Sequence, residues 1–124
     1  MKYSVDKQEK YAVFTLHEEN LNSRLAPNLR SEFYKLHNEE IQNVILDLSD
    51  VKYVDSSGLS AILSGRRAWE DFGSFIVTGV KSTHVKKLIE ISKLDAILTI
   101  IPTVEEAIEF VFMEEIERQL NDEE

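Results

Sequence analysis

Apolar and polar residues along this chain fall into blocks that predict strands alternating with helices. The segments expected to form strands are rich in β-branched and aromatic residues and lie at residues 3–5, 11–17, 43–48, 74–77 and 98–101. Between them, apolar residues recur at helical spacing, which predicts helices that begin near residues 26, 57, 83 and 104. The block at 43–48 is apolar almost throughout, as is typical of a strand buried on both faces.

Helix start and stop signals support these boundaries. Asn38 is expected to end the first helix, and Ser82 or Thr83 is expected to cap the third. Thr103, with Glu106 three residues later, forms the sequence pattern of a capping box at the start of the last helix. The apolar stripe of this last helix is expected to serve the core and comprises Val104, Ala107, Ile108, Val111, Phe112, Ile116 and Leu120.

Strands that alternate with helices at these lengths predict an α/β domain, a sheet covered by helices. A length of 124 residues fits one domain with one core. We therefore expect residues 1–124 to form a single domain, with an acidic C-terminal helix and tail from about residue 114.

Charge and composition argue against several classes of function, namely nucleic-acid binding, membrane insertion and cysteine chemistry. The formal net charge is −9, and residues 105–124 contain nine acids against one base, Arg118, so a nucleic-acid partner is not expected. No apolar run is long enough for a membrane span, and the N-terminus lacks the apolar segment of a signal peptide. The absence of cysteine excludes disulfides and thiolate chemistry. We expect a cytoplasmic protein.

The turn Asp55-Ser56-Ser57-Gly58 lies between the buried strand and the second helix. Its hydroxyls are therefore placed at a helix N-terminus, where free backbone N–H groups and the helix dipole favour negative charge. A serine there is well placed to carry a phosphate, which would add about −1.5 to −2 charges. Gly58, without a β-carbon, is expected to let a partner approach the hydroxyl.

Two other interpretations of this turn remain open. In the structural one, Asp55 and the serines only cap the second helix. In the catalytic one, Ser57 is a nucleophile, but Asp55 stands where a hydrolase elbow has its first glycine, and only His84 follows as a candidate base. We therefore expect a binding module rather than an enzyme, without a cofactor or metal of its own.

The residues 44–48, Val51 and the run from Val54 to Leu59 resemble the STAS domain (sulfate transporter and anti-sigma-factor antagonist). The chain is most similar to free-standing bacterial anti-sigma-factor antagonists, and the similarity extends through Leu21-Asn22, Leu94 and residues 103–107. The resemblance implies an α/β fold with a STAS-like mixed β-sheet of about five strands covered by four helices.

The resemblance also implies a partner-switching mechanism. In such proteins the unphosphorylated antagonist binds an anti-sigma factor that is also a serine kinase, and thereby frees the sigma factor. The kinase then phosphorylates the second serine of the motif, here Ser57 (with Ser56 as the alternative), and a protein phosphatase resets the cycle. The implied partner-binding residues are Asp55, Ser56, Ser57, Gly58, Leu59 and Asn22. Asp55 would shape the turn, Ser56 would cap the helix and Gly58 would give access.

Two positions depart from the family pattern. Asn22 replaces the usual aspartate, and Leu25 stands where a hydroxyl residue often caps the first helix, so that Asn22 or Ser23 would have to substitute. The same fold serves other functions. A small subunit of a bacterial lipid-transport ATPase and a stress-signalling scaffold component are the alternatives. The expected oligomeric state is a monomer or a weak dimer.

Overall fold

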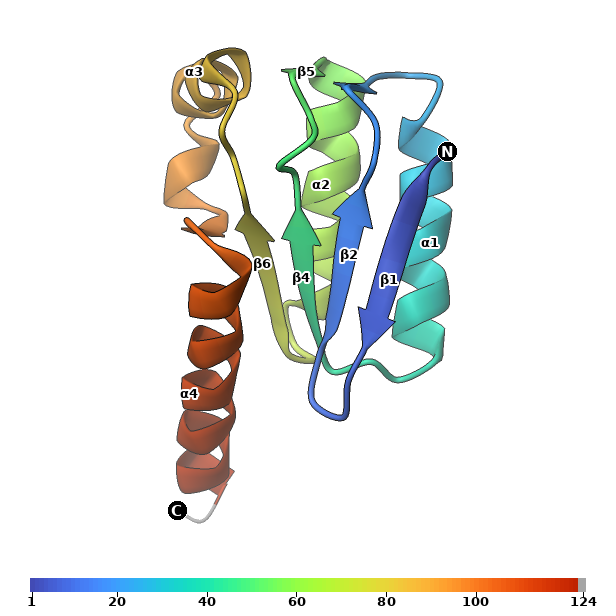
Figure 1. Cartoon of the computed structure of the whole chain (residues 1–124). Helices are drawn as coiled ribbons and strands as arrows, with labels where there is room; N and C mark the ends of the chain where they lie inside the picture. Colours follow the sequence, from blue (N-terminus) through green and yellow to red (C-terminus); the bar gives the residue numbers. More distant parts are fainter. Residues whose placement is uncertain (123–124) are drawn as a thin grey trace.

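The fold is a five-stranded mixed sheet with helices on both faces, described for residues 1–122 by a computed structural model (Figure 1). The order in the sheet is β1-β2-β4-β6-β7, and β1 pairs antiparallel with β2 while all other pairs are parallel. The strands are β1 (Tyr3–Lys7), β2 (Ala12–Leu16), β4 (Asn43–Asp47), β6 (Ser74–Thr78) and β7 (Thr99–Ile101). Two further short strands, β3 (Asn20–Leu21) and β5 (Tyr53–Val54), form a separate parallel ladder.

The helices divide between the two faces of the sheet and its carboxyl end. Helices α1 (Ala26–Asn38) and α2 (Ser56–Trp69) pack against each other and cover one face. Helix α4 (Val104–Asp122) packs on the other face over β4, β6 and β7. Helix α3 (Thr83–Ile91) lies at the carboxyl end of the strands, where it contacts β5 and a short 3-10 turn, η1 (Leu94–Ala96).

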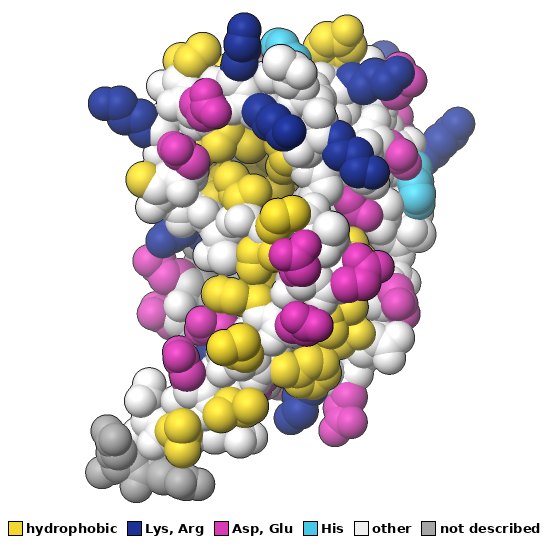
Figure 2. Space-filling view, turned by 60° about the vertical axis from the view of Figure 1, so that its left-hand side comes forward, with side chains coloured by type: hydrophobic (Ala, Val, Ile, Leu, Met, Phe, Trp, Pro, Cys, Tyr) yellow, Lys and Arg dark blue, Asp and Glu magenta, His cyan; other side chains and the backbone are white. Residues whose placement is uncertain are grey.

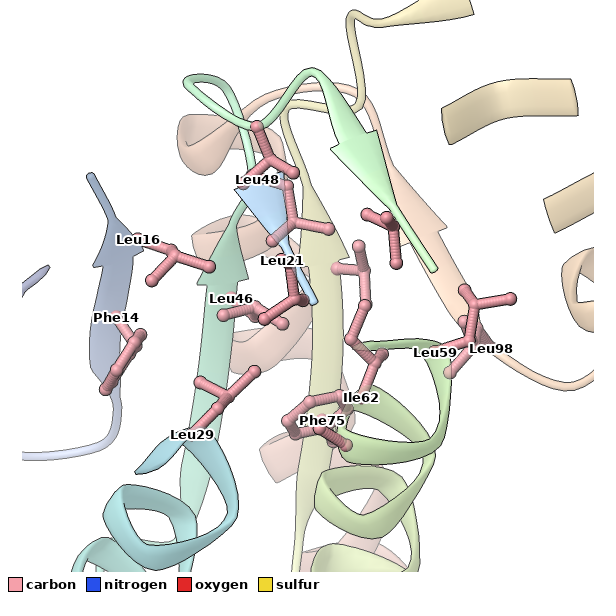
Figure 3. Close-up of a cluster of buried hydrophobic side chains, with 14 of the residues drawn as sticks. Phe14, Leu16, Leu21, Leu29, Leu46, Leu48, Leu59, Ile62, Phe75 and Leu98 are labelled. Carbon is pink, nitrogen blue, oxygen red and sulfur yellow. The ribbon is translucent and has the colours of Figure 1, made fainter. Parts of the chain in front are cut away.

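The larger core lies between the sheet and the α1–α2 layer (Figure 3). Alternate residues of the central strands point into it, for example Val44 and Leu46 of β4, which meet Leu29 of α1 and Ile62 of α2. The opposite face carries a much smaller apolar cluster under α4, which comprises Val13, Ile45, Ile76, Ala107 and Val111. Because both faces of β4 are covered, this strand needs the continuous apolar run that its sequence shows.

The predicted fold class is confirmed, and all five expected strands and four expected helices are present. The helix signals also hold. The Ser82 hydroxyl accepts a hydrogen bond from the Val85 N–H (3.2 Å), and Thr103 Oγ1 accepts one from the Glu106 N–H (3.1 Å). The Glu106 carboxylate in turn accepts a hydrogen bond from the Thr103 hydroxyl (3.0 Å). In the usual capping box it would accept from the backbone N–H of the N-cap residue instead.

The prediction for the apolar stripe of α4 is partly wrong. Ala107 and Val111 face the sheet, but Phe112, Ile116 and Leu120 are exposed. The acidic segment from about residue 114 is helical to Asp122, and the end of the predicted tail, residues 123 and 124, lies outside the described residues. Within residues 1–122, none of the helices combines the length and apolar character that crossing a bilayer requires.

Candidate partner-binding site

The β3–β5 ladder brings two distant loops together at the carboxyl end of the sheet. Asn20 pairs with Tyr53, and Leu21 pairs with Val54. The ladder continues through the Asp55 N–H, which donates to the Leu21 carbonyl (3.2 Å). Asn22, the next residue along, is thereby held beside the serine turn. The structure thus places together the two segments that the sequence singled out.

Asp55 is the N-cap of α2. Its backbone is extended (φ −99°, ψ −177°), and its Oδ1 accepts a hydrogen bond from the Gly58 N–H at 2.9 Å. The side chain therefore satisfies one of the free N–H groups of the first turn. The prediction that Asp55 shapes the turn is confirmed, whereas the prediction that Ser56 caps the helix is wrong, because Ser56 is already the first helical residue.

The two serines differ in exposure. Ser56 is exposed, and Ser57, the second residue of the helix, is half-buried. Among the described residues, the side-chain hydrogen bond at this turn is that of Asp55, so both hydroxyls are left for other partners. Their position in the first helical turn is also where the helix dipole favours an anion.

Gly58 and Leu59 lie beneath this surface rather than on it. Both are buried, and Leu59 belongs to the larger core. A β-carbon on residue 58 would stand 2.5 Å from the Leu21 carbonyl oxygen and 2.8 Å from Val54 Cγ1. The predicted role of Gly58 in giving a partner access is therefore corrected, since its lack of a side chain allows α2 to approach the β3–β5 ladder. The buried Leu59 anchors the helix and offers a partner little surface.

Asn22 organises the entry into α1. Its Oδ1 accepts from the Arg24 N–H (3.0 Å), and its carbonyl accepts from the N–H groups of Leu25 (3.1 Å) and Ala26 (2.9 Å). Leu25, at the N-cap position, makes no side-chain cap. Asn22 thus supplies the missing start signal of this helix, largely through its backbone, and needs no charge to do so.

Two side chains near the turn, Tyr53 and Arg30, were missed by the sequence analysis as site residues. Tyr53 is 54% exposed and stacks edge-on against His84, with ring centroids 5.3 Å apart. Arg30 of α1 donates to Ser60 Oγ (3.0 Å), one helical turn beyond Ser57. Tyr53 could have been found from the sequence, because it is an aromatic residue two positions before Asp55. The Arg30 contact depends on how α1 packs on α2, which no local pattern reveals.

The candidate base His84 is directed towards a backbone carbonyl. The His84 Nε2 lies 3.4 Å from the Val54 carbonyl, and within residues 1–122 no hydrogen bond joins this ring to Ser57. A polar hollow of about 540 Å³ is lined by Asn22, Arg24, the N-terminus and residues 17–20, which follow β2. Across the described part of the chain, no three His, Asp or Glu side chains are grouped as a metal would need.

Comparison with known proteins gives a consistent result. The STAS domain family model matches residues 2–107. A Thermotoga neapolitana protein, named as a homologue of the anti-sigma factor antagonist TM1081, is 30% identical over 79 residues, which span 64% of this chain and 70% of that protein.

Solved structures of anti-sigma factor antagonists share the fold. One from Mycobacterium paratuberculosis superposes with a TM-score of 0.80 at 19% identity, over 89% of this chain and 92% of that one. TM1081 of Thermotoga maritima gives 0.76 at 25% identity, over 88% and 93%. SpoIIAA of Bacillus, in its unphosphorylated form, gives 0.74 at 22% identity, over 89% and 96%. The family match, the sequence relative and the shared fold lead to one conclusion: this chain belongs to the STAS domain family.

Proposed function

We propose that this protein is an anti-sigma-factor antagonist that works by partner switching, controlled by phosphorylation of Ser57. The observation that carries the proposal is the position of Ser57. It is a half-buried hydroxyl in the first turn of α2, in a turn whose conformation is already fixed by the Asp55 cap. The named function of the Thermotoga neapolitana relative supports the same function here.

In the unphosphorylated state, the proposed partner is an anti-sigma factor with serine kinase activity. It would pack over the turn and the neighbouring exposed groups, namely Ser56, Ser57, Asn22 and the Tyr53 ring. Exposed aromatic residues near the centre of an interface often contribute most of its affinity. We therefore add Tyr53 to the proposed contact surface.

Phosphorylation would reverse this preference for binding. The helix N-terminus stabilises the phosphate within the protein, so the fold tolerates the modification. The same group, with about −1.5 to −2 charges next to the Asp55 carboxylate, would be desolvated and repelled in a closely packed interface. A mismatch of a few kcal/mol lowers affinity by roughly a hundredfold or more. SpoIIAA, which shares the fold, has been solved in a phosphorylated form. A protein phosphatase would return the chain to its binding state.

The test is affinity capture from the native host with wild-type, Ser57→Ala and Ser57→Glu forms as bait, and identification of bound proteins by mass spectrometry. We expect a kinase-type anti-sigma factor to be retained by wild type and by Ser57→Ala, and lost by Ser57→Glu. The matched control is Ser31→Glu, which adds the same charge at an exposed position of α1, away from the turn.

Circular dichroism of each bait excludes unfolding as the cause of a lost partner. A glutamate at the second helical position is compatible with the helix dipole, so Ser57→Glu should fold normally. Equal capture of an ATPase and permease by all three forms would contradict the proposal and favour the lipid-transport alternative. Loss with Ser56→Glu but not with Ser57→Glu would move the acceptor to Ser56.

A further inference from the structure

Helix α4 buries a carboxylate and exposes large apolar side chains, the reverse of the usual arrangement. Its inner face continues from Ala107 and Val111 to Glu115, which is only 9% exposed. Four apolar residues of the outer face, here called the outer stripe, are 45–66% exposed: Phe112, Met113, Ile116 and Leu120. Apolar side chains gather over this helix with acidic ones among them (Figure 2). The outer stripe lies beyond residue 107, where the family match ends.

A buried polar cluster, here called the polar anchor, fixes this orientation of the helix. Asn43 Nδ2 donates to Glu115 Oε1 (2.8 Å), and Arg118 donates to the same oxygen (2.7 Å) and to Ser74 Oγ (2.6 Å). The Asn43 Oδ1 in turn accepts from the Ser74 N–H (2.8 Å). Rolling α4 to bury the outer stripe would break these bonds and leave a carboxylate without partners. The outer stripe therefore remains exposed in the isolated chain.

The spacing of the outer stripe matches a helix as binding partner. Phe112, Ile116 and Leu120 recur at one residue per turn, and Met113 lies beside them on the same face. Burial of large apolar side chains is favourable, and contiguous exposed patches of this kind mark interaction sites. An amphipathic helix laid along the stripe would bury all four.

The charge around the outer stripe distinguishes two possible binding partners, a second copy of this chain and a helix of another protein. Residues 104–122 hold seven acids and one base, a net charge of −6, and the whole chain carries −9. Glu109 and Glu117 precede and follow Met113 by four residues, so they border the outer stripe along the helix. A second copy of this chain would bring the same acidic border against the first, which disfavours self-association. A helix bordered by lysine or arginine would instead find complementary charge.

We propose that the outer stripe is a docking surface for an amphipathic helix of another protein, with lysine or arginine beside its apolar face. This surface is separate from the Ser57 turn, so this proposal does not depend on the proposed partner switching through Ser57.

The probe is a synthetic amphipathic peptide with leucine at helical spacing and lysine at its remaining positions, and binding is measured by fluorescence anisotropy. We expect binding to wild type that weakens with salt, and no binding of the matched peptide with glutamate in place of lysine. The double variant Met113→Ser/Ile116→Ser should lower affinity at least about tenfold, which corresponds to about 1.4 kcal/mol. Ile91→Ser is the control, because Ile91 is 77% exposed on α3, outside the stripe.

Two results would overturn the proposal. The first is evidence that the peptide binds elsewhere: either binding that the double variant leaves unchanged, or amide chemical-shift changes on peptide addition that map away from α4. The other is a wild-type dimer in size-exclusion chromatography with light scattering that the double variant makes monomeric, because a second copy would then be the occupant. All substituted side chains are exposed, so loss of folding does not confound the comparison.

Discussion

At Gly58 the backbone of α2 passes so close to Leu21 that any β-carbon would meet its carbonyl oxygen at 2.5 Å. The obstacle is backbone, which cannot rotate away as a flexible side chain can. This glycine therefore sets how closely the Ser57 turn approaches the loop that carries Asn22. Its effect on function is indirect and acts through the shape of the site.

Gly58→Ala should consequently destabilise the protein by about 1–3 kcal/mol, the usual effect of overpacking. At an ordinary helix position the same substitution would stabilise the protein by about 1 kcal/mol, because alanine is the better helix former. A loss of stability would therefore report the close contact with Leu21. Urea unfolding measures the change, with Ser31→Ala at an exposed position of α1 as control. Unchanged or increased stability of Gly58→Ala would show that the close approach is not required.

Asp55→Ala should lower the free energy of unfolding by about 0.5–2 kcal/mol, because it removes the hydrogen bond to the Gly58 N–H. Asp55→Asn keeps a capping oxygen and should retain most of the stability. Thermal unfolding of the two variants separates the cap from the charge. Equal losses would mean that the negative charge, rather than the cap, stabilises the turn.

Substitution of Thr78 should increase stability, in contrast to the substitutions of Gly58 and Asp55. It is fully buried in β6, and its hydroxyl has no hydrogen-bond partner among the described residues. Thr78→Val replaces this hydroxyl with a methyl group of similar shape and should stabilise the protein by about 1 kcal/mol. Thr99→Val, at an exposed position of β7, is the control and should change little. Destabilisation of Thr78→Val in urea unfolding would show that the hydroxyl is satisfied in solution.

At this scale the sequence identified the right turn but not the role of each residue in it. The motif from Asp55 to Leu59 is local, so it can be recognised directly. The function of Gly58 depends on Leu21, a residue far away in the sequence, and Leu59 is buried by contacts that several elements make together. Asn22 was predicted as a possible cap for α1, but its side chain accepts from the Arg24 N–H before the helix, and only its backbone carbonyl accepts from the first helical N–H, that of Ala26.

Among the elements, α4 depends most on contacts with distant parts of the chain. The polar anchor joins its second half to the amino ends of β4 and β6, through Asn43 and Ser74. The side chains of Glu115 and Arg118 are only 12% and 30% exposed, so their ion pair is weakly screened. The anchor therefore fixes the orientation of this helix together with its apolar contacts.

Arg118→Met should lower the free energy of unfolding by about 2 kcal/mol or more, because it leaves the Glu115 carboxylate buried with fewer donors. The double variant Glu115→Met/Arg118→Met removes both charges and should recover part of the loss. Urea unfolding of both variants measures the coupling between the two residues. Additive losses in the double variant would contradict a coupled anchor.

The elements that the sequence predicted well are those with a clear periodic pattern. The five main strands and four helices belong to this group. Strands β3 and β5 were missed, because two residues cannot show a period and both strands exist only through their mutual pairing. The α4 sequence contains two adjacent apolar arcs, and the choice between them depends on Asn43, 72 residues before Glu115. No local pattern contains that information.

For the whole molecule, the Ser57 turn and the outer stripe lie at opposite ends. Helix α2 begins at the end where the strands finish, whereas the second half of α4 runs towards the other end (Figure 1). Distant sites without shared contacts behave independently. We therefore expect Ser57→Glu to leave peptide binding at the outer stripe unchanged, and Met113→Ser/Ile116→Ser to leave capture of the proposed anti-sigma factor unchanged. Titrations of each variant with both partners test this, and coupling beyond about 0.5 kcal/mol would contradict independence.

The loops at the Ser57 end are joined to one another mainly through backbone atoms. The N–H groups of Lys52 and Tyr53 both donate to the Glu19 carbonyl (2.8 and 3.0 Å), and one side chain, the Ser82 hydroxyl, donates to the Lys52 carbonyl (2.6 Å). Side chains such as those of Glu19 and Lys52 are exposed and can be exchanged without disturbing this framework. Duplicated copies of such a gene could therefore diverge in partner choice through surface substitutions alone. Several parallel signalling routes could then use the same turn in one cell without cross-talk.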